Sequence, residues 1–177
     1  MTQRLTDMGI MARRPEHPVV RDSTARRDGW PRGPWDDEAD EYEWRHFGFP
    51  CLIIRNVLGA LCGYVAVAEG HPWFGKDADD IDASAHGGIC YTDVCARNIC
   101  HIPRAGEPAR VWWVGFDCAH YNDLCPALGC AFDYQTYKPI SYVVREVRNL
   151  AKQAHVAVHP RARPRPRTPA GITAPGA

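Results

Sequence analysis

The sequence predicts an α+β fold in which an antiparallel sheet of about four or five short strands packs against one C-terminal amphipathic helix. Two observations carry this prediction. Short apolar or alternating segments, separated by glycine and proline, recur between residues 50 and 116, as is typical of strands joined by turns. One segment with apolar residues at three- and four-residue steps follows near the C-terminus.

The first two predicted strands cover residues 50–57 and 61–68. Gly59 lies in the short link between them, which favours an antiparallel hairpin. Residues 61–68 are apolar at nearly every position, so we expect both faces of this strand to be covered.

The next predicted extended segment alternates between polar and small apolar residues over 80–86. Gly87 and Gly88 then break or bulge it. Residues 89–92 resume the strand with Ile, Cys, Tyr and Thr.

Residues 99–102 predict a short extended piece, and residues 111–116 predict the central strand. The second of these is rich in β-branched and aromatic side chains, which favour strands. Its aromatic residues are expected to belong to the core.

The predicted helix follows a loop over residues 124–136. Pro139 suits the first helical turn, where the missing N–H costs no hydrogen bond. The apolar stripe that should pack on the sheet consists of Ile140, Val143, Val147, Leu150, Ala151 and Ala154.

Charge divides the chain into three parts. Residues 1–33 hold seven arginines against four acids, and residues 156–177 hold four arginines and no acid. Because the whole chain balances 21 basic against 21 acidic residues, the middle carries a net charge of −7. We therefore predict disordered basic arms at 1–33 and 156–177 around a single α+β domain at 34–155. Residues 36–43, which hold six acids, are predicted to be a solvated segment.

The acidic middle makes nucleic acid an unexpected partner, since it would repel a phosphate backbone. No apolar run approaches the roughly 20 residues of a membrane span, and residues 1–14 lack the apolar core of a secretory signal. We expect no membrane association and a cytoplasmic location. The eight cysteines should then be free thiols, mostly buried, without disulfides.

Chemistry-bearing side chains follow the predicted central strand directly: Asp117, Cys118, His120 and Asp123. Cys118 and His120 would project from the same face of an extended segment. His86 precedes a glycine pair, where a ligand can approach the backbone closely. If these loops meet at one end of the sheet, they form a site.

Three chemistries suit that set. His86, Cys118 and His120 could hold zinc, with one position left open. Alternatively, Cys118 could be a nucleophile activated by His86 or His120 and oriented by Asp123. In that case the N–H groups of Gly87 and Gly88 would receive an oxyanion.

The third chemistry is a binding pocket without catalysis, which would hold a small ligand. The residues expected to line it are His71, Trp73, Gly87, Gly88 and Asp117. Against all three stands a purely structural interpretation, in which the polar side chains only fix turns.

Four fragments occur in a characteristic order: Cys-Gly-Tyr-Val at 62–65, Gly-His-Pro at 70–72, His-Gly-Gly at 86–88, and Trp-Trp-Val-Gly-Phe-Asp-Cys-Ala-His at 112–120. Together they resemble an uncharacterised family of small bacteriophage and actinobacterial prophage proteins, over roughly residues 50–154. Members of that family often carry Gly where this chain has Asn122. The resemblance implies a phage or prophage origin and supplies no reaction.

The function expected from the sequence is therefore that of a small accessory protein that binds a host protein or a small ligand without catalysis. The alternative is a small hydrolase-like enzyme that uses His86, Cys118, His120 and Asp123, with zinc as a candidate metal. Both expectations require that the His-Gly-Gly loop and the Asp-Cys-Ala-His loop meet.

Overall fold

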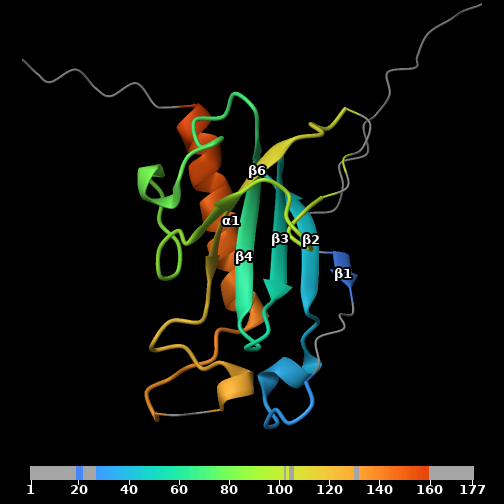
Figure 1. Ribbon diagram of the computed structural model, residues 1–177, viewed down its shortest axis with the longest axis vertical. Helices are drawn as coiled ribbons and strands as arrows, with labels where there is room; N and C mark the ends of the chain where they lie inside the picture. Colours follow the sequence, from blue (N-terminus) through green and yellow to red (C-terminus); the bar gives the residue numbers. More distant parts are fainter. Residues whose placement is uncertain (1–18, 22–26, 102, 104–105, 130–131, 160–177) are drawn as a thin grey trace, which may run out of the picture.

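Six antiparallel strands form one sheet in the order β1-β2-β3-β4-β6-β5, and one α-helix lies along a face of it (Figure 1). This computed structural model describes residues 19–21, 27–101, 103, 106–129 and 132–159 of the chain. The predicted α+β class, antiparallel sheet and C-terminal helix are confirmed. The strands are β1 (Val19–Arg21), β2 (Glu41–His46), β3 (Phe49–Arg55), β4 (Leu61–Ala68), β5 (Tyr91–Asp93) and β6 (Val111–Asp117). The helices are α1 (Ile140–Val158) and the 3-10 helices η1 (Pro34–Asp37), η2 (Ala78–Asp80) and η3 (Pro126–Leu128).

Strand β2 corrects the expectation that residues 36–43 are a solvated acidic segment. Tyr42 and Trp44 are buried in the core, while Glu41 and Glu43, which alternate with them, are less buried and point away from it. This period-two alternation is the ordinary pattern of a half-buried strand. Phe47 and Gly48 both have positive φ angles, 49° and 84°, and form the two-residue turn that leads into β3. The high acid content of the segment concealed the alternation.

The hairpin predicted around Gly59 is confirmed, with β3 and β4 paired antiparallel. Asn56 stabilises the link, because its side-chain oxygen accepts hydrogen bonds from the N–H groups of Leu58 and Ala60, each at 3.0 Å. Every residue of β4 except its last is buried, so both faces of this strand are covered as expected.

Strand β6 lies second from the edge of the sheet, which corrects its expected central position. It pairs with β4 on one side and with the three-residue β5 on the other. Trp113, Val114 and Phe116 are almost completely buried, as the sequence predicted. The central strands of the sheet are β3 and β4.

Residues 80–86 do not form the strand that their alternation predicted. η2 ends at Asp80, and the chain then continues without regular structure to a turn at Gly87 and Gly88. Ile81 packs into the core, and Ala83 and Ala85 pack against it. The segment is extended but lies off the sheet edge, so its alternation reflects packing of one side only. Of the predicted piece 99–102, Ile99 forms an isolated bridge with Ala96, and residue 102 lies outside the described residues.

Helix α1 packs its apolar stripe onto the sheet, chiefly over β3 and β4. The five residues buried on this face are Val143, Val147, Leu150, Ala151 and Ala154, as predicted. Gly63 in β4 permits the close approach, because a Cβ there would lie 2.5 Å from a methyl group of Val147. None of the helices in the described ranges has the length and apolar character needed to cross a membrane.

The opposite face of the sheet carries a second, smaller core. Tyr64 and Trp113 are its largest members, and Tyr91 and Ile99 pack against it from the segment that contains β5. Two-sided burial explains why β4 is apolar throughout. The buried members are Leu52, Ile54, Cys62, Tyr64, Ala66, Val111 and Trp113.

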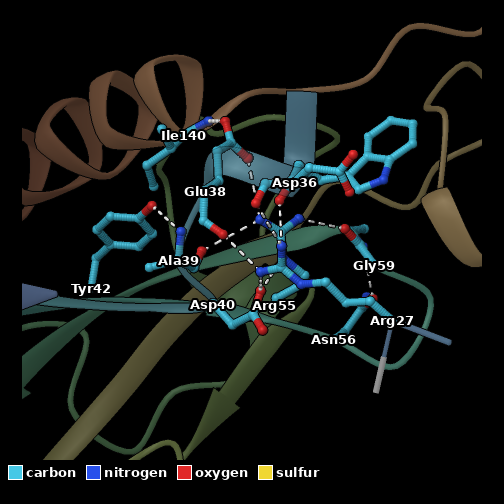
Figure 2. Close-up of polar contacts among 12 residues, drawn as sticks. Arg27, Asp36, Glu38, Ala39, Asp40, Tyr42, Arg55, Asn56, Gly59 and Ile140 are labelled. Atoms are coloured by element: carbon cyan, nitrogen blue, oxygen red, sulfur yellow. Dashed lines mark hydrogen bonds and ion pairs between the residues drawn. The ribbon is translucent and has the colours of Figure 1, made fainter. Parts of the chain in front are cut away.

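A buried ionic network joins the start of the domain to β3 and α1 (Figure 2). The Arg55 side chain is fully buried, and its Nε donates to Asp40 at 2.5 Å. Glu38 accepts from Arg55 at 3.2 Å and from the N–H of Ile140, the first residue of α1, at 2.7 Å. Arg27 forms an ion pair with the same oxygen of Asp40. The acids of residues 36–43 thus include two that hold the fold together.

Both predicted arms include ordered residues at their inner ends. Val19–Arg21 forms β1 against β2, and Arg27 joins the ionic network. At the other end α1 continues to Val158, three residues beyond the expected domain limit at 155. Residues 1–18, 22–26 and 160–177, which make up most of the expected arms, lie outside the described residues.

Cys95 and Cys100 form a disulfide, which corrects the expectation that disulfides are absent. Ala96 and Ile99 between them exchange two backbone hydrogen bonds of 3.0 Å, and this tight turn brings the two cysteine Cα atoms to 4.6 Å. The other described cysteines are free thiols, of which Cys90 is exposed and Cys51, Cys62, Cys118 and Cys125 are buried. Residue 130, the eighth cysteine, lies outside the described residues.

Candidate functional site

The His-Gly-Gly loop and the loop that follows β6 meet beside the first turn of α1. Nε2 of His86 lies 2.8 Å from Oδ2 of Asp123, and Nδ1 of His120 lies 3.3 Å from the same oxygen. The two imidazole rings contact each other edge to face, with centroids 5.3 Å apart. Three of the four residues expected to carry chemistry are therefore in direct contact.

Asp123 is the fixed centre of this group. The loop after β6 folds back on itself, so the N–H of Asp123 donates to the carbonyl of His120 at 2.8 Å. In return, Oδ2 of Asp123 accepts the N–H of His120 at 3.0 Å. Asp123 also forms an isolated bridge with Thr136, and its side chain is only 2% exposed. These contacts hold the carboxylate rigidly beneath the two imidazoles.

Asp123 is held as an anion. Burial alone would raise its pKa, but hydrogen bonds from His86 and from the His120 amide more than offset that effect and lower the pKa below the usual value. Lys138 adds to the lowering, with its Nζ 3.3 Å from Oδ1. The carboxylate is therefore available as an acceptor or as a metal ligand.

His86 is held at both ring nitrogens. Its Nδ1 lies 2.9 Å from the hydroxyl of Tyr142, which comes from the first turns of α1. Since a carboxylate can only accept, Nε2 carries the proton toward Asp123, and in the neutral ring the Tyr142 hydroxyl donates to Nδ1. The orientation of the His86 ring is thus set by two independent elements of the fold.

Gly87 allows the two loops to approach. It has a φ of +68°, and a Cβ at this position would lie 2.0 Å from Cε1 of His120. No side chain larger than hydrogen fits there without moving the His120 ring. Gly88 also has a positive φ, +99°, but has open space around it.

The meeting point lies in the wall of an open cavity of about 490 Å³. The cavity is lined by His86, His120 and Asp123 together with Tyr121, Lys138 and Tyr142. The His120 side chain is 38% exposed, so it is the most accessible member of the three. A small ligand can therefore reach the imidazoles and the carboxylate.

Cys118 does not join this site, contrary to the sequence-based expectation for both the nucleophile and the metal set. Its residue is 2% exposed and belongs to the core beneath α1, with its N–H bonded to the carbonyl of Leu61 at 3.1 Å. Burial, together with nearby Asp123, raises the pKa of the Cys118 thiol far above its ordinary value. An inert core thiol results, because the strand alternation directs position 118 inward.

His71 and Trp73 lie elsewhere, which corrects their expected place in the same pocket. His71 is buried, donates from Nε2 to the carbonyl of Ala154 at 3.0 Å, and accepts the N–H of Trp73 on Nδ1 at 3.0 Å. These bonds attach the loop after β4 to the C-terminal part of α1. Trp73 is buried in the core and borders a separate cavity of about 710 Å³ beside α1.

Asp117 and Gly88 are adjacent to the site but already engaged. Oδ1 of Asp117 accepts the N–H of Ala119 at 2.8 Å and lies 3.8 Å from Nδ1 of His120. The N–H of Gly88 donates to the carbonyl of Ala85 at 3.0 Å, so it is not available as the oxyanion donor that the sequence suggested.

The arrangement of His86, His120 and Asp123 suits a metal ion. One ligand atom from each residue lies within 4.8 Å of the others. Metal–ligand distances of about 2.0–2.2 Å place tetrahedral ligands roughly 3.3–3.5 Å apart. Oδ2 of Asp123 lies 2.8 Å and 3.3 Å from the two ring nitrogens, which is close to this spacing. Asp123 thus takes the place that the sequence assigned to Cys118.

Lys138 and Tyr142 are site residues that sequence reasoning missed. Both lie at the start of α1, where a lysine and a tyrosine read as ordinary surface residues. The one feature of the sequence that could have indicated them is their position, just before and within the first turn of the predicted helix. Only the contact between that helix end and the β6 loop reveals their role.

Comparisons with protein-family models, with curated proteins and with solved structures find no match to this chain. The resemblance to small phage and prophage proteins therefore stays a prediction. The geometry of the site carries the functional argument by itself.

Proposed function

We propose that this chain is a small binding protein whose ligand is a divalent transition metal ion, held by His86, His120 and Asp123. The observation that carries the proposal is the convergence of two imidazoles and one buried carboxylate at the wall of an open cavity. Two of these residues, His86 and Asp123, are held in place by further side chains.

Zinc is the ion that fits the donor set best. Two nitrogen ligands and one carboxylate oxygen are a common zinc combination, whereas calcium and magnesium prefer sites built from oxygen alone. Imidazole also suits copper and nickel, so the ligand types define a class of ion and zinc is its most abundant biological member.

The surroundings resemble the outer shell of established metal sites. Tyr142 would accept a hydrogen bond from Nδ1–H of His86 once Nε2 binds the metal, which fixes the ring tautomer. Lys138 holds the second oxygen of Asp123 and leaves Oδ2 for the ion. Such partners orient the ligands, and their loss typically lowers metal affinity about 10- to 100-fold.

The test is zinc titration of the untagged, chelator-treated chain, followed by calorimetry or by competition with a zinc-responsive dye. We expect one ion per chain, and a loss of at least about 100-fold in affinity for His86→Ala, His120→Ala and Asp123→Asn. Tyr142→Phe should lower the affinity about 10- to 100-fold. His159→Ala, at an exposed histidine at the end of α1, is the matched control and should bind as the parent does.

Two results would contradict the proposal. One is a parent protein that takes up no zinc at micromolar concentration. The other is a His86→Ala variant whose affinity equals that of the parent. Circular dichroism of each variant establishes that the loss of binding is not a loss of folding.

A second candidate function is metal-dependent hydrolysis, and one observation favours it. Three protein ligands leave a position open toward the cavity, which is the arrangement of catalytic rather than structural zinc. Bound there, zinc would act as a Lewis acid toward an ester or phosphoryl oxygen. Zinc-dependent turnover of an aryl ester or aryl phosphate that is lost in Asp123→Asn and retained in Cys118→Ser would establish this reading.

A further inference from the structure

Three exposed aromatic side chains form a stack beside the metal-binding cavity. This aromatic stack consists of Tyr121, Phe132 and Tyr134, which are 71%, 47% and 47% exposed. Phe132 and Tyr134 are parallel, with an interplanar angle of 6° and centroids 5.2 Å apart. Tyr121 lies 5.6 Å from Tyr134 and 6.1 Å from Phe132, centroid to centroid. Large apolar groups gathered on a surface commonly mark a binding site.

The stack is continuous with the cavity through Tyr121. This residue follows His120 directly in the chain, and it lines the same cavity as His86 and Asp123. The loop that positions the carboxylate therefore also presents the ring, and Gln135 ties the two parts together by donating to the Tyr121 carbonyl at 3.1 Å. A ligand bound at the metal would therefore lie next to the Tyr121 side chain.

The net charge of the cavity indicates the charge of the ligand group that would bind at the metal. With neutral imidazoles, Asp123 and the adjacent Asp117 supply two negative charges, and Lys138 offsets one of them at 3.3 Å from Asp123. A divalent ion therefore leaves a local excess of positive charge. An anionic oxygen group, such as a phosphate, is the complement of that field.

We propose that the ligand of this site is a nucleoside monophosphate, with its phosphate at the metal and Lys138 and its base stacked on Tyr121. The proposal rests on the metal site proposed above and specifies what completes it. A nucleobase is flat, and any of the four bases can stack on an exposed aromatic ring. In a nucleotide, a single sugar separates the base from the phosphate. The residues proposed to contact these two groups, Tyr121 and His120, are likewise neighbours in the chain. The net charge of −7 in residues 34–155 favours a mononucleotide over a long nucleic acid.

The test is calorimetric titration of the zinc-loaded full-length chain with four probes: inorganic phosphate, adenosine, adenosine monophosphate and a twelve-nucleotide single-stranded DNA. We expect the monophosphate to bind at least about fivefold more tightly than phosphate or adenosine, since stacking of one base adds about five- to 100-fold. The DNA should bind more weakly than the monophosphate.

Variants separate the two parts of the ligand. Tyr121→Ala should lower the affinity for the monophosphate about five- to 100-fold, which is a larger loss than it causes for inorganic phosphate. Tyr121→Phe retains the ring and should bind the monophosphate as the parent does. Lys138→Gln, compared with the parent at zinc concentrations that saturate both, should weaken phosphate and monophosphate alike.

Each contrary outcome has a distinct meaning. Phosphate that binds as tightly as the monophosphate, or Tyr121→Ala without effect, overturns the role of the stack while the metal site stands. Tighter binding of the DNA overturns the mononucleotide in favour of a nucleic-acid surface. Failure of the parent to bind zinc overturns the metal site and this proposal together.

Discussion

Gly87 and His120 approach so closely that a Cβ on Gly87 would lie 2.0 Å from Cε1 of the imidazole. This contact is the point where the His-Gly-Gly loop and the loop after β6 meet. His120, a candidate metal ligand 33 residues further along the chain, can therefore keep its position only if residue 87 is glycine.

Gly87→Ala should therefore displace His120 and lower zinc affinity roughly tenfold or more. Gly88→Ala is the matched control, because it also places alanine at a positive φ, +99°, but in open space. Both variants should lose about 1–2 kcal/mol of unfolding free energy from backbone strain. Zinc titration and urea unfolding of the two variants check this. Equal zinc affinities for both would show that the Gly87–His120 contact is unimportant for the site.

The buried ionic network predicts an asymmetric response to charge removal. Asp40→Asn leaves the fully buried Arg55 guanidinium without its closest carboxylate, and we expect a loss of about 3 kcal/mol in unfolding free energy (Figure 2). Glu69→Gln breaks the exposed pair with Arg110 and should cost less than about 1 kcal/mol. Urea unfolding measures both. Similar losses in the two variants would mean that burial does not determine the strength of these pairs.

Cys118 should resist alkylation in the native protein. Its thiol is buried and its pKa is raised, so the reactive thiolate is scarce at pH 8. We expect iodoacetamide to leave Cys118 unmodified in native conditions and to modify it fully in urea, as peptide mass spectrometry would show. Rapid native labelling would restore Cys118 as a candidate nucleophile.

His71 should make stability depend on pH in the mildly acidic range. Burial lowers its pKa in the folded protein, although the hydrogen bond to the Ala154 carbonyl partly opposes this. An unfolded imidazole has a pKa of about 6.5 and so takes up a proton first as the pH falls. The unfolding free energy should therefore decrease as the pH drops below about 6.5 and be constant in this respect above it.

Urea unfolding of the parent and of His71→Asn between pH 5 and 8 checks this. The variant should be less stable at pH 8 and show a flatter pH dependence below pH 6.5. A slope identical to that of the parent would assign the effect to other groups.

The fold class could be predicted from the sequence because the buried face of a strand or helix gives a periodic pattern of apolar residues. The apolar run of β4 and the stripe from Val143 to Ala154 on α1 each follow the period of their element. β2 shows the period-two pattern in Tyr42 and Trp44, but the six acids of residues 36–43 predict a solvated segment. The order of strands was not readable, because pairing of β6 with β4 joins segments more than 40 residues apart.

For the site, the sequence by itself determined the candidates and the tertiary structure determined which of them belong together. His86, His120 and Asp123 stood out as polar groups beside glycine or after a strand, and so did Cys118 and His71. Residue type alone does not tell which way a side chain points. The alternation of β6 directs Cys118 into the core, and hydrogen bonds attach His71 to α1. Lys138 and Tyr142 enter only because α1 packs its first turns against the loop after β6. A site assembled from three separate segments exists only once the core has fixed their relative positions.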